Sequence, residues 1–433
     1  MSAVTPAPGP VQTGLVPDEP EIQAQIRWRT PVIYLVLGLV SLVFFGLLTP
    51  SDDRTRFMVS TSTDFVQIAP FAIPSQLAAT LLSVIALVLA GWVVLMTSRR
   101  RAVPGWVPLA FGVTVLLAFL VWVMAGNSNA MPLTVLLTAA LVLAVPLVFG
   151  SLAGLLCERS GIINIAIEGQ LLAGAFLTVV VGSLTGNPYL GMLAAPIAGA
   201  LVGFGLVLFA VRYWVDQIIV GVVLNVLVIG VTNYLFSTVL TQNPQQLNNP
   251  PRLPTLPIPF LSEIPVLGPV LFKHSLIVYL MFVAVAVLQV MVFRSRWGLR
   301  MRAVGEHPKA ADTVGIKVNP TRVRNTVLGG AVAGLGGAAL MAAGLAFTKE
   351  LTSGKGYIAL AAMILGRWSP KGAFAAALLF GFADSLRQVL GNLGSPVPSQ
   401  FLAMLPYLAT IFAVAGLVGR VRPPAAEGKA YIK

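Results

Sequence analysis

The stretch RSRWGLRMRAVGEHPKAADTVGIKVNPTRVR, residues 294–324, is a basic island between long apolar stretches. Eight of its residues are Lys or Arg, and only two are acidic. Pro308 suits the first position of a helix and Gly315 the position after its end, so the sequence predicts a short helix over residues 308–314. A polar loop that carries its own helix between apolar spans indicates a surface that a partner grips.

The composition around this island predicts a membrane protein. Hydrophobic residues make up 57% of the 433 residues and charged residues 10%, against about 25% charged in an ordinary soluble domain. Apolar runs of about 18–20 residues, enough to cross a bilayer as a helix, recur along the chain. The predicted fold class is all-α, a polytopic membrane helix bundle with about 10–12 transmembrane helices. The number depends on whether the two short apolar pieces on either side of residues 366–372 each cross or form a re-entrant, broken pair.

The distribution of charge predicts the topology. If the N-terminus lies inside and the spans alternate, about 21 of the 28 Lys and Arg residues fall on one face. This asymmetry follows the positive-inside rule, so the net charge of +13 needs no nucleic-acid partner. We expect a multi-pass protein of a bacterial cell (inner) membrane with both termini in the cytoplasm. No cleavable signal is expected at the N-terminus.

The chain divides into segments of different character. The part between residues 241 and 272 holds eight Pro residues and is expected to be an ordered outer loop or cap. The expected segments are a disordered cytoplasmic tail at 1–26, N-terminal transmembrane helices at 27–130, a transport core at 131–420 that contains the basic loop 294–325, and a cytoplasmic C-terminal tail at 421–433.

Pairs of small residues four positions apart recur in the apolar runs. Such spacing lets helices approach closely in lipid. The pairs are Gly150/Gly154, Gly199/Gly203, Gly330/Gly334 and Ala377/Gly381.

Common catalytic motifs are missing from the sequence. It has no GxxxxGK[ST] phosphate loop, GxSxG, HExxH or CxxC. The single Cys157 excludes an internal disulfide and a multi-cysteine metal site, and His274 and His307 are read as ordinary loop residues. We therefore expect no cofactor, no metal and no motor within this chain.

A few polar residues stand inside apolar runs. Glu168 would cost roughly 2.5–3.5 kcal/mol at the centre of a bilayer, so it needs a partner or a role. Asn164 is predicted to lie one turn away on the same helix face. Asn225 and Asn233 are about 80° apart on an ideal helix and can share a pore-facing side. Hydrogen bonding between helices, contact with a solute and gating all remain open for these side chains. Asp384 is expected to pair with Arg387, as positions i and i+3 of one helix.

Three segments resemble one family of proteins. They are ERSGIINIAIEGQLLAGAF (158–176), VGEHPKAADTVGIKV (304–318) and GYIALAAMILGRWSPKGAFAAALLFG (356–381). Together they resemble bacterial ABC importer permeases of the simple-sugar, nucleoside and branched-chain amino acid group, and most closely the nucleoside branch. The long N-terminal tail and the Pro-rich outer loop do not match this family.

The resemblance implies residue roles. The basic loop would carry the helix that couples the permease to its ATPase, through Gly305, Glu306, Pro308, Ala310, Ala311, Gly315 and Ile316. Apart from the resemblance, the polar residues inside the apolar runs give the candidate pathway or gating residues, which are Asn164, Glu168, Gln170, Asn225 and Asn233.

The resemblance also implies partners. They are a cytosolic ABC ATPase that hydrolyses the ATP, a second permease subunit that is a copy or a different chain, an extracytoplasmic solute-binding lipoprotein, and membrane lipids. The solute would be small, neutral and polar, such as a nucleoside or simple sugar, because buried charge is scarce. The alternatives are an ion-coupled secondary transporter, which would depend on Glu168 or Asp384, and a membrane enzyme acting on lipids.

Overall fold

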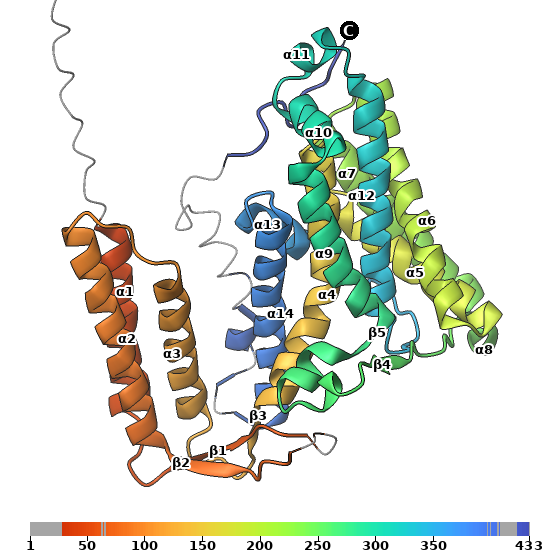
Figure 1. Cartoon of the computed structure of the whole chain (residues 1–433). Helices are drawn as coiled ribbons and strands as arrows, with labels where there is room; N and C mark the ends of the chain where they lie inside the picture. The colour runs from red at the N-terminus through yellow and green to blue at the C-terminus, as the bar shows by residue number, and fades with distance from the viewer. Residues whose placement is uncertain are drawn as a thin grey trace, which may run out of the picture. The chain divides into compact units, whose positions relative to one another are not determined.

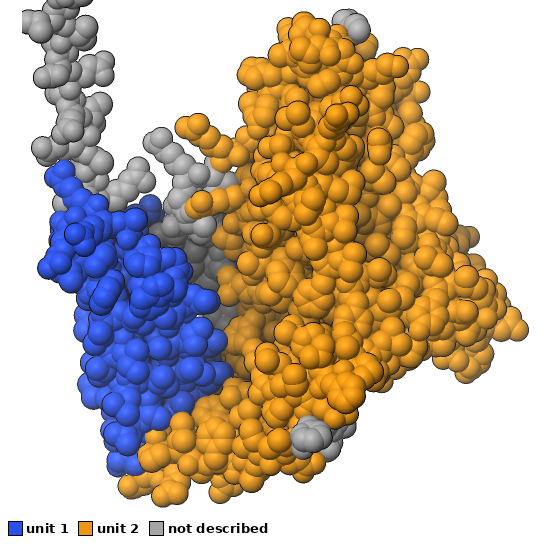
Figure 2. All heavy atoms as spheres, viewed as in Figure 1, with its two compact units in different colours: residues 1–51, 76–122 blue, residues 52–75, 123–433 orange. Residues whose placement is uncertain are grey.

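A computed structural model describes residues 28–432, except 62–63, 65, 396, 399, 405–406 and 408–421. The chain forms two compact units, one of residues 1–51 and 76–122 and the other of residues 52–75 and 123–433 (Figure 2). The expected N-terminal tail lies outside the described residues, as does the expected last span at 401–418 apart from 401–404 and 407.

The first unit is built from three apolar helices. Ala86 and Ala90 are fully buried and pack against Phe111, whose ring lies 4.6 Å from that of Tyr34. Most of the remaining apolar side chains point outward, as expected for helices that face lipid. The helices are α1 (Arg29–Val40, continued by a π-helical turn, Ser41–Leu47), α2 (Ser75–Ser98) and α3 (Trp106–Val123) (Figure 1).

The second unit contains the other helices. They are α4 (Leu133–Glu158), α5 (Ile167–Thr185), α6 (Pro188–Val207), α7 (Gln217–Leu235), α8 (Pro244–Leu247), α9 (Leu276–Arg294), α10 (Arg296–Glu306), α11 (Pro308–Thr313), α12 (Val318–Leu340), α13 (Lys355–Leu365) and α14 (Pro370–Asn392). Short π-helical turns extend α6 over Leu208–Arg212 and α7 over Phe236–Leu240.

The membrane helix bundle is confirmed, with one correction. Among the described residues, 9 helices are long and apolar enough to cross a membrane. The prediction that both apolar pieces around residues 366–372 are short is wrong for the second. While α13 has 11 residues, α14 has 23, because it continues past residue 386 to Asn392.

Short strands, which the sequence reading did not predict, lie in the loops of the second unit. One sheet has the order β2-β1-β3, with β1 antiparallel to β2 and parallel to β3; the other pairs β4 with β5. The Pro-rich segment is ordered and mostly non-helical, as expected. The strands are β1 (Arg54–Met58), β2 (Phe71–Pro74), β3 (Met131–Pro132), β4 (Thr255–Pro257) and β5 (Lys273–Ser275).

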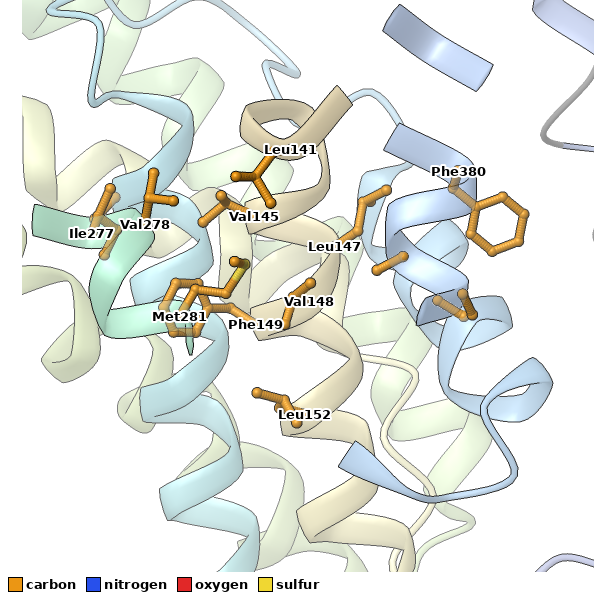
Figure 3. Close-up of a cluster of buried hydrophobic side chains, with 14 of the residues drawn as sticks. Leu141, Val145, Leu147, Val148, Phe149, Leu152, Ile277, Val278, Met281 and Phe380 are labelled. Carbon is orange, nitrogen blue, oxygen red and sulfur yellow. The ribbon is translucent and has the colours of Figure 1, made fainter. Parts of the chain in front are cut away.

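The core of the second unit is organised around α4. Its buried side chains form one cluster with Ile277, Val278 and Met281 of α9 on one side and Phe380 of α14 on the other (Figure 3). Where α5, α6 and α12 meet, glycines replace larger side chains. A Cβ added to Gly199 would collide with the carbonyl oxygen of Gly330, so α6 and α12 approach closely through two of the small-residue pairs noted in the sequence.

Candidate functional site

The basic loop folds into two short helices between α9 and α12. The Ser295 hydroxyl accepts a hydrogen bond from Gly298 N–H (3.1 Å) at the start of α10. As predicted, α11 begins at Pro308, and Gly315, with φ +83°, follows its end. The sequence reading missed α10, although the Ser295 cap and the buried, helically spaced Met301 and Val304 could have indicated it.

The second short helix, α11, has a buried side and an exposed side. Ala311 is buried against Val304 and Val318, which anchors the helix to α10 and α12. Val314, just after the helix, is 74% exposed. Of the residues predicted to couple to an ATPase, Gly305 and Ala311 are buried, Pro308 and Ile316 are half-buried, and Glu306, Ala310 and Gly315 are exposed.

The segment between α4 and α5 is a buried, non-helical turn. Gly161 has φ +90°, which ends the helical path, and α5 starts only at Ile167. Asn164 therefore does not share a helix face with Glu168, and that prediction is wrong. Its side-chain amide instead pairs with that of Gln170 through two hydrogen bonds, of 3.0 and 3.2 Å.

Glu168 holds the start of α13. Its Oε1 accepts a hydrogen bond from Gly354 N–H (2.7 Å) and its Oε2 from Gly356 N–H (2.6 Å). Free N–H groups and the positive end of the helix dipole favour a carboxylate at this place. The negative charge of Glu168 is thus stabilised by backbone N–H groups of the protein, and these hydrogen bonds link α5 to α13. This partner was not predicted, although the Gly-Lys-Gly turn (354–356) before a short apolar piece is a signal for it in the sequence.

The two asparagines of α7 differ in their partners. Asn225 Oδ1 accepts from Gly169 N–H (2.8 Å), and its Nδ2 donates to Ile165 O (2.8 Å) and Tyr357 Oη (3.3 Å). Asn233 Oδ1 is buried without a hydrogen-bond partner among the described residues. Asn225 therefore links α7 to the same non-helical turn and to α13. Contact with a solute stays a prediction for all five candidate pathway residues.

A cavity of about 220 Å³ is lined by residues of α4, α13 and α14 and by Leu402, Ala403 and Tyr407. Lys355, Asp384 and Arg387 supply its charges, and Asp384 and Arg387 form the predicted ion pair at 2.9 Å. Within the described residues no group of three His, Cys, Asp or Glu side chains is placed to hold a metal ion.

Known proteins share this chain's transport core. Residues 136–415 match the family described as branched-chain amino acid transport system / permease component. The chain belongs to this permease family. The permease is thus a component of an ABC transport system, a multi-pass membrane protein and not itself an enzyme.

Several relatives of the permease carry names that include a solute. The guanosine ABC transporter permease protein NupQ of Bacillus subtilis is 39% identical over 313 residues, which are 70% of this chain and 97% of NupQ. The nucleoside ABC transporter permease protein NupC of Lactococcus lactis is 36% identical over 70% of this chain and 98% of its own. The putative glucose ABC transporter permease protein TsgC13 of Haloferax volcanii is 34% identical over 58% of this chain and 76% of its own. No solved structure matches the permease significantly.

Proposed function

We propose that the permease is the membrane subunit of an ATP-driven importer that carries nucleosides. Of the relatives named above, the permeases for guanosine and nucleosides are 39% and 36% identical, and the putative glucose permease follows at 34% over a smaller share of the chain. A neutral polar solute also agrees with the site, since Glu168 uses both carboxylate oxygens on backbone N–H groups. Nucleosides are therefore preferred to simple sugars and to ions.

The observation that carries this proposal is that α11 is short, anchored on one side and exposed on the other. This six-residue helix is anchored through Ala311 and leaves Ala310 and Val314 exposed. A helix of this kind could bind in a groove of a partner protein, and movement of the partner would then displace it. The sequence has no phosphate loop of its own, so the energy would come from a cytosolic ABC ATPase that grips α11. The proposed assembly adds a second permease subunit and an extracytoplasmic solute-binding lipoprotein, in a bacterial cell membrane with both termini of the permease in the cytoplasm.

The proposal is tested with Ala310→Arg in the assembled transporter. A large cation on the exposed side of α11 would block docking of the ATPase without disturbing the core. We expect ATP-driven nucleoside uptake into proteoliposomes to be lost, while the variant still inserts into the membrane. The matched control is Ala102→Arg, an exposed alanine in the loop between α2 and α3, which leaves uptake unchanged.

Two results would contradict this function. Uptake by Ala310→Arg at the wild-type rate would mean that α11 does not couple the permease to the ATPase. Uptake by the purified permease alone, driven by a proton or sodium gradient, would instead identify an ion-coupled carrier. Binding of guanosine, uridine and glucose to the lipoprotein then ranks the solutes.

A further inference from the structure

The last described residues of the chain, 422–432, run along the basic loop and are here named the C-terminal strap (Figure 1). Ala425 N–H donates to Glu306 Oε2 (3.2 Å) and Ala426 N–H to Gly305 O (2.9 Å), both at the end of α10. Gly428 N–H donates to Gly161 O (3.3 Å) in the turn between α4 and α5. The strap is therefore bonded to α10 and to the non-helical turn at the same time.

Side chains add to these backbone bonds. Arg322 of α12 is 1% exposed, and its Nη1 donates to the carbonyl oxygen of Lys429 (2.8 Å). Tyr431 packs on the cluster of Val304, Ala311 and Val318 that anchors α11. Four elements thus meet on one short segment: α10, α11, α12 and the non-helical turn.

One contact joins the strap to the end of α4. The Glu427 carboxyl group of the strap interacts with the Glu158 carboxyl group at the end of α4. Burial raises the pKa of Glu427. Glu158 also accepts a hydrogen bond from Trp368 Nε1 (2.6 Å), in the turn between α13 and α14. Through Glu158, the strap is therefore also connected to the turn between α13 and α14.

We propose that the C-terminal strap transmits movement of α11 to the turn between α4 and α5, and so to the membrane helices. The inference rests on the proposed function, in which an ATPase moves α11. The strap bonds α10 on one side and Gly161 on the other, and a hydrogen bond weakens steeply when its geometry is lost. Since Tyr431 and α10 both pack on the cluster that anchors α11, a displacement of α11 that carries them along pulls the strap, and the strap then either pulls the turn with it or breaks. From this turn, Asn225 and Glu168 carry the connection to α7 and α13.

The strap offers a variant that is specific to its position. Gly428 has φ +73°, and a Cβ there would lie 2.9 Å from the end of the Ile163 side chain. Gly428→Val should therefore release the strap, as should a chain that ends at residue 421. Ala430→Ser, at an exposed strap position, is the matched control.

The test compares these variants in the full complex with its ATPase and binding protein, in proteoliposomes. We expect Gly428→Val and the truncated chain to co-purify with the ATPase and to hydrolyse ATP. Nucleoside transported per ATP should fall at least about five-fold, the lower end of the usual coupling between two sites. Ala430→Ser should keep the wild-type ratio.

Hydrogen exchange of the isolated full-length permease gives a second readout that does not need transport. The amides of Ala426 and Gly428 should exchange slowly in the wild type and fast in Gly428→Val. Fast exchange in the wild type, or an unchanged transport ratio in the truncated chain, overturns the strap and leaves the proposed function standing. A wild-type complex without ATP-driven uptake instead overturns the proposed function.

Discussion

Two polar side chains of the second unit, Glu168 and Asn225, accept or donate hydrogen bonds to backbone groups that have no partner within a helix. The first N–H groups of a helix lack intrahelical partners, and an unpaired group away from water is costly. Glu168 serves the start of α13, and Asn225 serves Gly169 and Ile165 around the start of α5. Both residues therefore make the interrupted helices possible, whatever else they do.

Glu168→Gln should lower the stability of the permease. The amide keeps one acceptor oxygen but turns an NH₂ group toward Gly354 or Gly356, so a charge-assisted bond is lost. We expect about 1.5–3 kcal/mol less stability, measured by thermal unfolding in detergent. Asp384→Asn, which breaks the partly exposed ion pair with Arg387, is the control and should cost less than about 1 kcal/mol. An unchanged unfolding temperature with lost transport would instead indicate solute contact by Glu168.

Asn225→Leu and Asn233→Leu should separate two similar residues of α7. The first leaves Gly169 N–H and Ile165 C=O unpaired, at about 1–3 kcal/mol for each group. The second removes an oxygen that is already without a partner among the described residues, so it should be neutral or stabilising. Unfolding curves of the two variants in the same detergent make the comparison. Equal destabilisation by the two substitutions would show that the hydrogen bonds of Asn225 do not contribute more to stability than the side chain of Asn233.

At the scale of elements, the sequence predicted features that depend on neighbouring residues and did not predict contacts between residues far apart in the chain. Pro308 and Gly315 predicted α11 because both act on their own backbone. The partner of Glu168 could not be predicted, since Gly354 lies 186 residues away and only the fold brings them together. The prediction that Asn164 and Glu168 share a helix face was wrong, because Gly161 adopts a positive φ that interrupts the helix and that the periodicity of the sequence does not reveal.

The contact between α6 and α12 depends on glycine. In Gly199→Ala the new Cβ meets the carbonyl oxygen of Gly330, which is backbone and cannot rotate away. We expect a loss of about 1–3 kcal/mol from overpacking, seen as a lower unfolding temperature. Gly230→Ala in α7, where nothing lies within 4 Å of the added Cβ, is the control and should stabilise the helix slightly. A Gly199→Ala variant as stable as the wild type would mean that these helices can move apart freely.

At the scale of the whole molecule, the family match separates two parts of the chain. It covers residues 136–415, so α1, α2 and α3 lie outside it. The three motifs that resemble the permease family are spread along this range, so the family could be predicted from the sequence. The three preceding helices were predicted only as apolar spans, and their composition indicates no role beyond the membrane.

The orientation of the permease can be tested with two engineered cysteines on either side of α9. Phe260 is 88% exposed in the Pro-rich loop, and Lys309 is exposed on α11. Because the basic loop should stay inside, a membrane-impermeant maleimide should label Phe260→Cys in intact cells and Lys309→Cys only after permeabilisation. The wild type is the control, since its single Cys157 is buried and should stay unlabelled. The reverse pattern would place α11 outside the cell, where no cytosolic ATPase could reach it, and labelling of both sites in intact cells would mean that α9 does not cross the membrane.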